Sequence, residues 1–344
     1  MLGSSAVPPC EAYDLTMFDL DGVVYIGGKP VPGAPETIAA LRDSGARIAF
    51  ITNNASRPPD AVARNLVRMG VQVWEDDIVT SAQAAARLLA ARLPPESRVL
   101  MLGAEGLARA LVEEALVPVR ETTDDGSVAA VVTGYGPDVV WRDVMRAAVL
   151  IRDGVWWVAS NTDLTLPTSF GTAPGHGVMV RMLSQFSGVE PEVAGKPARP
   201  LFDETLRRVG GRRPLMVGDR LDTDIEGAYH AGLDSLLVMT GVSQLPEVVT
   251  APPHQRPTYV ATELTGLLKP QPVVEEEALD GSGSRWSSGG WQAVVSDGRL
   301  GVTGEGGPDD WWRVVASAAW QHLDRTGAAV DIDGVTPLEP TDRG

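Results

Sequence analysis

The chain has 344 residues and a hydrophobic content of 44%, which suffices for two or three domains with cores of their own. Its formal net charge of −16 argues against unaided binding to nucleic acid or an anionic membrane, because both require basic patches. The single cysteine, Cys10, excludes an internal disulfide and a thiolate metal site. The opening residues "MLGSSAVPPCEAYD" lack a basic and apolar leader. We therefore expect a cytoplasmic protein with no membrane span.

Short apolar runs alternate with helical patterns as far as about residue 270. The runs expected to form buried parallel strands are Leu15–Phe18, Ile48–Ile51, Val99–Leu102, Val128–Val132, Val155–Ala159 and Leu215–Val217. The stretches expected to form helices are Ala34–Ser44, Pro59–Met69, Ser81–Arg92, Glu105–Glu114, Val139–Ile151 and Pro200–Val209. This alternation predicts an α/β fold with a doubly wound parallel sheet, in which ligands bind beyond the carboxyl ends of the strands.

The composition changes after residue 270. Residues 271–284 combine proline, a glutamate run and a Gly/Ser stretch, which is typical of a linker. The following "WQAVVSDGRLGVTGE" predicts two strands joined by a type I′ turn at Asp297-Gly298, and "PDDWWRVVASAAWQHLD" predicts a helix. Residues 285–344 are thus expected to form a small acidic αβ module. Its tryptophans are expected in the core and at an interface: Trp286, Trp291, Trp311, Trp312 and Trp320.

Four groups of polar residues along the chain each follow an apolar segment. They are Asp19 and Asp21 in "FDLDGVV", Thr52 and Asn53 in "IAFITNN", Lys196 in "VAGKPA", and Asp219 and Asp224 in "PLMVGDRLDTDI". Each has a plain alternative: the paired acids could cap a turn or form the DxD of nucleotide-sugar transferases, and the other residues could be a helix cap, a solvated charge and a turn residue. However, hydroxyl and backbone N–H groups bind phosphate, lysine adds positive charge, and carboxylates hold a hard cation. Together, in this order and each at a strand end, they indicate one site.

These motifs also match a known pattern. DLDGV (Asp19–Val23), TNN (Thr52–Asn54), GKP (Gly195–Pro197) and GDRLDTDI (Gly218–Ile225) resemble the motifs of haloacid dehalogenase superfamily phosphatases. The likeness covers about residues 13–270 and is strongest to the class IIA branch, which includes 4-nitrophenylphosphatase, phosphoglycolate phosphatase and glycerol-3-phosphate phosphatase proteins. The resemblance implies a core formed by residues 1–80 and 191–270 and an inserted α/β cap of the C2 type at residues 81–190.

The resemblance also implies the roles of the motif residues. Asp19 would be the nucleophile that forms an aspartyl phosphate, and Asp21 would be the general acid and base. Mg²⁺ would be held by the Asp19 carboxylate, the Asp21 backbone carbonyl and the Asp219 carboxylate, and Asp224 would either support these ligands from behind or serve as an alternative ligand. The phosphate oxygens would be bound by Thr52, Asn53 and Lys196.

The segment "SNTDLTLPTSFGTAPGHGVMVRM" resembles the substrate loop of that branch, and a plain connecting loop is the alternative. Asn161, Asp163 and His176 are its candidate contacts. His176 stands between two glycines where the branch often has a small residue or threonine. We expect His176 at the surface or in loop packing rather than in catalysis, because the carboxylates already supply acid–base chemistry.

The expected substrate is a small phosphorylated metabolite, with glycerol 3-phosphate first and 2-phosphoglycolate next. The order rests on the tail, which looks like that of some actinobacterial glycerol-phosphate phosphatases and weakly resembles a truncated GCN5-related acetyltransferase fold. Within the tail, "GEGGP" (Gly304–Pro308) is expected to be a flexible loop rather than an acetyl-CoA site. A general 4-nitrophenyl-phosphate or nucleotide phosphatase, a phosphotransferase, and a regulatory protein that binds a ligand through the tail stay open. So does homodimer formation.

Overall fold

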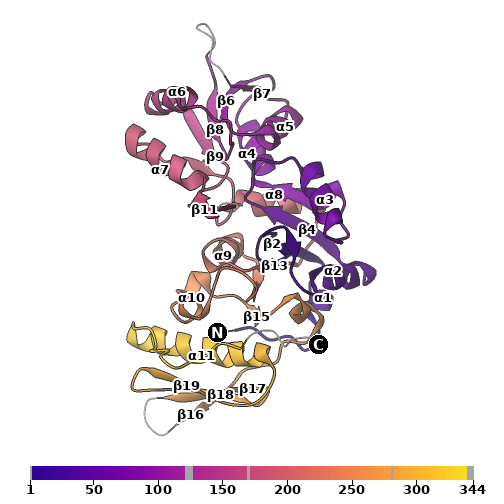
Figure 1. Ribbon diagram of the computed structural model, residues 1–344, viewed down its shortest axis with the longest axis vertical. Helices are drawn as coiled ribbons and strands as arrows, with labels where there is room; N and C mark the ends of the chain where they lie inside the picture. The colour runs from indigo at the N-terminus through magenta and orange to yellow at the C-terminus, as the bar shows by residue number, and fades with distance from the viewer. Residues whose placement is uncertain (1, 121–126, 169–170, 280–282, 339–344) are drawn as a thin grey trace. The chain divides into compact units, whose positions relative to one another are not determined.

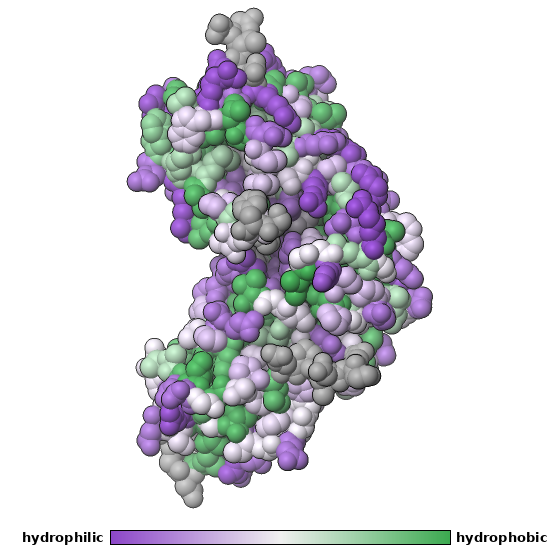
Figure 2. Space-filling view, in the orientation of Figure 1, coloured by the Kyte–Doolittle hydropathy of each residue, from purple (hydrophilic) through white to green (hydrophobic). Residues whose placement is uncertain are grey.

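The computed structural model describes residues 2–120, 127–168, 171–279 and 283–338 (Figure 1). The chain divides into two compact units by contacts between residues. The first unit contains Met1–Ile48, Met69–Gln72 and Gly211–Gly344, and the second contains Ala49–Arg68 and Val73–Gly210. Hydrophilic residues are spread over much of the face shown in Figure 2, with hydrophobic residues in smaller groups between them.

The first unit is built on parallel strands in the order β15-β14-β13-β1. Their bounds are Leu15–Phe18 (β1), Pro214–Gly218 (β13), Asp234–Val238 (β14) and Tyr259–Ala261 (β15). Leu15 pairs with Pro214 and Phe18 with Val217. The strands are continuous apolar runs because both faces of the sheet are buried, and all four residues of β1 are buried.

Short elements surround these strands in the first unit. The helices are Pro9–Ala12 (α1), Ala34–Asp43 (α2), Leu221–Ile225 (η2), Glu226–Ala231 (α9), Leu245–Val249 (α10), Pro253–Gln255 (η3) and Leu264–Leu268 (η4). Strands Tyr25–Ile26 (β2) and Lys29–Pro30 (β3) form a small hairpin just after β1. The π-helical turn η2 begins three residues after β13 ends, so it starts at the carboxyl edge of the sheet.

The C-terminal module is an antiparallel sheet covered by one helix (Figure 1). Its strands are Glu275–Ala278 (β16), Ser284–Ser288 (β17), Trp291–Ser296 (β18) and Arg299–Gly304 (β19), and its helix is Pro308–Thr326 (α11). The hairpin prediction is confirmed: β18 pairs with β19, and both turn residues, Asp297 (φ 51°) and Gly298 (φ 77°), have the positive φ of a type I′ turn. The helix prediction for α11 is confirmed as well.

Residues 271–284 are not a plain linker. Strand β16 lies within this segment and pairs with β17, and the side chain of Gln271 is buried. The exposed glutamates of β16 made this segment look like a linker. Charged residues are common on an edge strand because they protect it from pairing with further strands.

The second unit contains a parallel five-stranded sheet in the order β12-β9-β8-β6-β7. Its strands are Arg98–Leu102 (β6), Val117–Val119 (β7), Ala130–Thr133 (β8), Trp156–Ala159 (β9) and Glu192–Val193 (β12). Its helices are Pro59–Arg68 (α3), Glu75–Asp77 (η1), Ser81–Ala90 (α4), Glu105–Glu113 (α5), Trp141–Arg152 (α6), His176–Ser187 (α7) and Pro200–Val209 (α8). Strands Arg47–Thr52 (β4) and Ile78–Thr80 (β5) pair in parallel, and Thr165–Thr168 (β10) pairs with Gly171–Pro174 (β11) as a hairpin.

The parallel sheets and the flanking helices confirm the α/β fold class. The expected strands and helices all occur, with ends that shift by a few residues. The expected substrate loop differs, because it contains the β10–β11 hairpin and the first half of α7. Its proline and glycine residues obscured the helical pattern of α7, whose buried residues are His176, Gly177, Val180 and Leu183.

Candidate active site

Three carboxylates meet beyond the ends of β1 and β13 in the first unit. Oxygens of Asp19, Asp219 and Asp224 lie within 4.8 Å of one another. Asp219 and Asp224 are fully buried, and Asp19 is partly buried. Three anions at this distance repel each other unless a cation or protons offset their charge. An all-oxygen set of carboxylates is what Mg²⁺ prefers, so these residues fit a magnesium ion.

Asp219 is held by backbone groups of a neighbouring loop. The Val242 N–H donates to Asp219 Oδ2 at 2.7 Å, and the Ser243 N–H donates to the Asp219 carbonyl at 3.1 Å. Gly22 (φ 89°) and Gly241 both approach the Asp219 carboxylate so closely that a Cβ atom at either would overlap it. Both glycines are therefore required by the space around this side chain.

Asp224 is placed by the η2 turn. Its Oδ2 accepts a hydrogen bond from the Arg220 N–H at 3.1 Å. Asp222, on the same turn, is exposed and forms an ion pair with Arg220 at 2.8 Å. The turn thus separates two acids that are two positions apart in the sequence, and it brings only Asp224 into the carboxylate cluster.

Asp21 lies in a different environment from Asp19. It is exposed, and Tyr25 Oη donates a hydrogen bond to its Oδ2 at 3.1 Å. The backbone between them turns tightly, with the Gly22 N–H bonded to the Tyr25 carbonyl at 2.8 Å. Tyr25 was not among the predicted site residues, although it follows Asp21 by only four residues in the sequence.

Thr52, Asn53 and Lys196 belong to the second unit, where two of them are tied together. Asn53 Nδ2 donates to the Lys196 carbonyl at 3.0 Å, and the Lys196 N–H donates to Asn53 Oδ1 at 2.8 Å. Thr52 Oγ1 accepts a hydrogen bond from the Asn54 N–H at 3.1 Å. All three predicted residues are buried, and Lys196 is only 2% exposed.

The three cap-loop candidates join the same network. Asn161 Nδ2 donates to the Asn53 carbonyl at 2.7 Å, and Asn53 Nδ2 donates to Asp163 Oδ1 at 3.0 Å. His176 Nδ1 lies 2.8 Å from the Asn161 carbonyl, which can only accept, so Nδ1 carries the proton. These contacts link the loop to the end of β4 through side chains.

His176 is not a surface residue, which corrects one of its two expected placements. It is 4% exposed, and burial lowers its pKa to about 4, against a smaller raising effect of the hydrogen bond to Asn161. The imidazole is therefore neutral at pH 7. Its position at the start of α7, bonded to Asn161, agrees with the expected loop-packing role.

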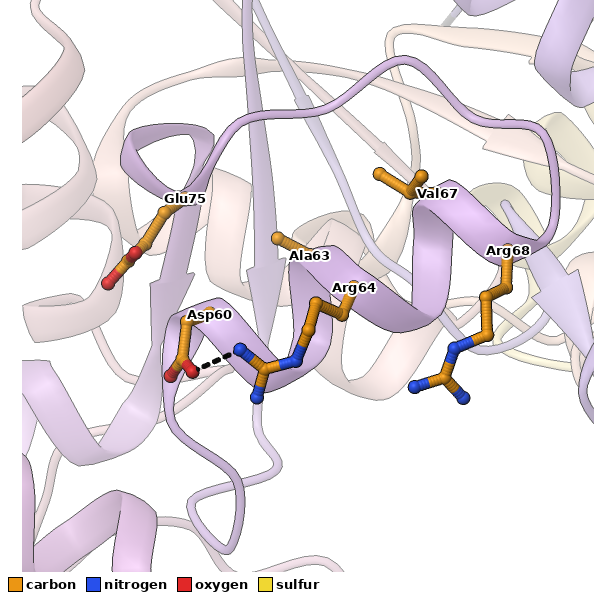
Figure 3. A pocket seen from close by; sticks show the side chains of 6 residues that line it. All are labelled: Asp60, Ala63, Arg64, Val67, Arg68 and Glu75. Carbon is orange, nitrogen blue, oxygen red and sulfur yellow. Dashed lines mark hydrogen bonds and ion pairs between the residues drawn. The ribbon is translucent and has the colours of Figure 1, made fainter.

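A surface hollow of about 470 Å³ lies along α3 (Figure 3). It is lined by Asp60, Ala63, Arg64, Val67, Arg68 and Glu75. Asp60 forms ion pairs with Arg64 at 2.6 Å and Arg109 at 2.7 Å, and the hydrogen bond from Arg64 lowers its pKa. Since none of the predicted site residues lines this hollow, we assign it no part in the chemistry. Among the described residues, no helix is both long and apolar enough to cross a membrane.

Comparison with known proteins identifies this arrangement. Residues 16–116 match the haloacid dehalogenase-like hydrolases, and residues 193–267 match a second family of hydrolases of that type. The chain is 42% identical to D-glycerol 3-phosphate phosphatase from Mycobacterium tuberculosis over 320 residues, which cover 90% of this chain and 87% of that protein. It is 32% identical to a 5′-nucleotidase from Bacillus subtilis, with 74% and 97% covered.

Solved structures agree with these relatives. A glycerol phosphate phosphatase from Mycobacterium tuberculosis in complex with magnesium superposes with a TM-score of 0.82 at 42% identity, covering 92% of each chain. A 4-nitrophenylphosphatase from Thermotoga maritima has a TM-score of 0.69 at 28% identity, covering 76% of this chain and 98% of that one. The chain belongs to the haloacid dehalogenase superfamily, as a phosphatase of its class IIA branch.

Proposed function

We propose that this phosphatase hydrolyses glycerol 3-phosphate to glycerol and inorganic phosphate. The observation that carries the substrate assignment is the 42% identity to D-glycerol 3-phosphate phosphatase over nearly the whole of both chains. The Asp19, Asp219 and Asp224 cluster supports the dependence on Mg²⁺.

The proposed reaction uses Asp19 and Asp21 in turn. The Asp19 carboxylate attacks phosphorus, the bond from phosphorus to the ester oxygen breaks, and Asp21 gives its proton to the departing alkoxide. Asp21 then takes a proton from the water that hydrolyses the aspartyl phosphate, which restores both carboxyl groups. Mg²⁺, when bound by Asp19, Asp219 and the Asp21 carbonyl, supplies positive charge that offsets the repulsion between carboxylate and phosphate.

The hydrogen bonds of Asp21 and Asp224 refine their proposed roles. Tyr25 donates to the Asp21 carboxylate and so orients it for proton transfer while it stays in contact with water. Asp224 lies in the carboxylate cluster, which supports its role as an alternative ligand.

We assign phosphate binding to Thr52, Asn53 and Lys196. Both polar atoms of the Asn53 side chain already make hydrogen bonds within the second unit. We therefore assign its phosphate contact to the backbone N–H. Asn161, Asp163 and His176 hold this strand end in place, and residues 81–190 are proposed as the cap that selects the alcohol.

A panel of phosphate esters tests the substrate assignment. We expect the kcat/KM for glycerol 3-phosphate to exceed those for 2-phosphoglycolate, a nucleoside monophosphate and 4-nitrophenyl phosphate by about tenfold or more. A chelator should abolish phosphate release, and added Mg²⁺ should restore it. A nucleotide in first place would favour the second candidate, which the 5′-nucleotidase relative supports. Released phosphate that carries no label from ¹⁸O-water would indicate a phosphotransferase.

Three further assignments are part of this proposal. We place the protein in the cytoplasm, in keeping with its single cysteine. The sheet and helix of residues 285–338 support a truncated GCN5-related acetyltransferase fold without catalytic function. A homodimer is proposed through α6, where Trp141, Met145 and Val149 form an exposed apolar stripe at intervals of four residues.

A further inference from the structure

The loop of residues 240–244 connects the metal-binding edge of the first unit to helix α10. The loop holds Asp219 through the Val242 and Ser243 N–H groups. Ser243 Oγ also accepts the Leu221 N–H at 3.1 Å, at the start of the turn that carries Asp224. A displacement of this loop would therefore move the Val242 N–H that donates to the Asp219 carboxylate, and the Ser243 hydroxyl that supports the turn carrying Asp224.

Helix α10 follows the loop without a break, and the C-terminal helix α11 packs against it. Trp320 Nε1 donates to the Val248 carbonyl at 2.7 Å, and Trp320 is 2% exposed. The same carbonyl accepts the Ala251 N–H at the longer distance of 3.3 Å. Trp320 thus makes the shorter of these two bonds to the last turn of α10.

Arg256 fixes the Trp320 ring in this position. Its guanidinium lies 5.3 Å from the ring centre, donates to both Asp324 oxygens at 2.7 Å, and its Nε donates to the Ala251 carbonyl at 3.0 Å. Leu221, Leu245 and Val248 belong to the same hydrophobic cluster as Trp320. The contacts from α11 to Asp219 thus pass through the buried residues Val248, Leu245 and Ser243, although Val242 itself is exposed.

We propose that Trp320 is a positioning residue for the metal ligand Asp219, acting through α10 and the 240–244 loop. The C-terminal module then has a function in the phosphatase reaction: it sets the affinity of the carboxylate cluster for Mg²⁺. This inference rests on the proposed role of Asp219 in binding Mg²⁺. It requires no ligand site in the module itself.

The test compares Trp320→Phe with Trp286→Phe. Both substitutions remove an indole N–H from a buried tryptophan of the same cluster, but Trp286 donates to Gln321 Oε1 at 3.3 Å within the module. We measure Mg²⁺ binding directly by calorimetry in the absence of substrate, and then the Mg²⁺ dependence of phosphate release. Loss of groups that orient a ligand typically weakens metal binding about 10–100-fold. Trp320 acts on Asp219 only indirectly, through α10 and the loop, so we expect Trp320→Phe to weaken Mg²⁺ binding by about three- to tenfold. The kcat at saturating Mg²⁺ should stay within about twofold, because the reacting groups are intact.

The outcomes separate this inference from the proposed function. Wild-type affinity in Trp320→Phe, with binding lost in Asp219→Asn, would overturn the inference and leave the metal site in place. Equal Mg²⁺ affinity in Asp219→Asn and the wild type would instead refute the metal site. An equal loss of affinity in Trp286→Phe would show a general effect of core damage and would also overturn the inference. If Trp320→Phe does not fold, Asp324→Asn, which changes an exposed partner of Arg256, carries the test with a smaller shift in the same direction; unchanged affinity there would contradict it.

Discussion

At the scale of single residues, the motif carboxylates could be predicted and their hydrogen-bond partners could not. Asp19 and Asp219 follow apolar strands, and parallel topology brings such positions to one edge. The partners of Asp219 come from Val242 and Ser243, which carry no motif, and they donate through the backbone. The phosphate-binding role of Asn53 stays a prediction, and the hydrogen bonds of its side chain to Lys196 could not be read from the sequence.

His176 gives a prediction for stability against pH. Burial lowers its pKa to about 4, so the unfolded chain, with a pKa near 6.5, binds the proton more tightly. The stabilisation that comes from keeping this imidazole neutral is complete above about pH 7 and is lost as the pH falls toward 4. We expect the difference in unfolding free energy between the wild type and His176→Gln to change by about 3 kcal/mol over this range. Urea unfolding at several pH values measures it, and parallel curves would contradict the burial of a neutral histidine.

Among the elements, β1 and α8 were predicted with their observed ends, because an acid follows the apolar run of β1, and Pro200 and Gly210 bound the helical pattern of α8. Helix α7 was missed because a proline and two glycines surround its first turn, and strand β16 because its side chains are exposed acids. Both missed elements depend on contacts with other parts of the chain. The β16 backbone is ordered by pairing with β17, which local composition does not encode.

The exposed stripe of α6 gives a prediction for assembly. Trp141 and Met145 are 62% and 51% exposed, and an apolar helix face of this kind is stable in water only at a cost. If two copies pair through it, Trp141→Glu combined with Met145→Glu should convert the dimer to a monomer, because the new charges would face each other. Sedimentation velocity measures the mass. A wild-type monomer, or a variant that stays dimeric, would refute the proposed interface.

At the scale of the whole chain, the C-terminal module is part of the first unit, and its described residues share a core with the rest of that unit. Trp311, Trp312 and Trp320 of α11 share one hydrophobic cluster with Leu245 and Val249 of α10. A ligand-binding tail that could be removed without effect on the phosphatase, which the sequence left open, is therefore not favoured by the packing.

Truncation after residue 270 tests this. Each large buried side chain contributes about 1.5–3 kcal/mol, so loss of α11 should lower the melting temperature by about 10 °C or more, or cause aggregation. Differential scanning calorimetry gives the result. A truncated chain that melts at the wild-type temperature with wild-type kinetics would show that the module is independent.

The proposed reaction requires that Asp19 forms a covalent bond to the phosphoryl group. Asp21→Asn should accumulate the aspartyl phosphate with 4-nitrophenyl phosphate, because that leaving group needs no acid but hydrolysis of the intermediate still needs the base. Acid quenching, borohydride reduction and peptide mass analysis would locate the modified residue. We predict conversion of Asp19 to homoserine only in samples that received substrate and Mg²⁺. Modification at another residue, or none while phosphate is still released, would contradict the assignment of Asp19 as the nucleophile.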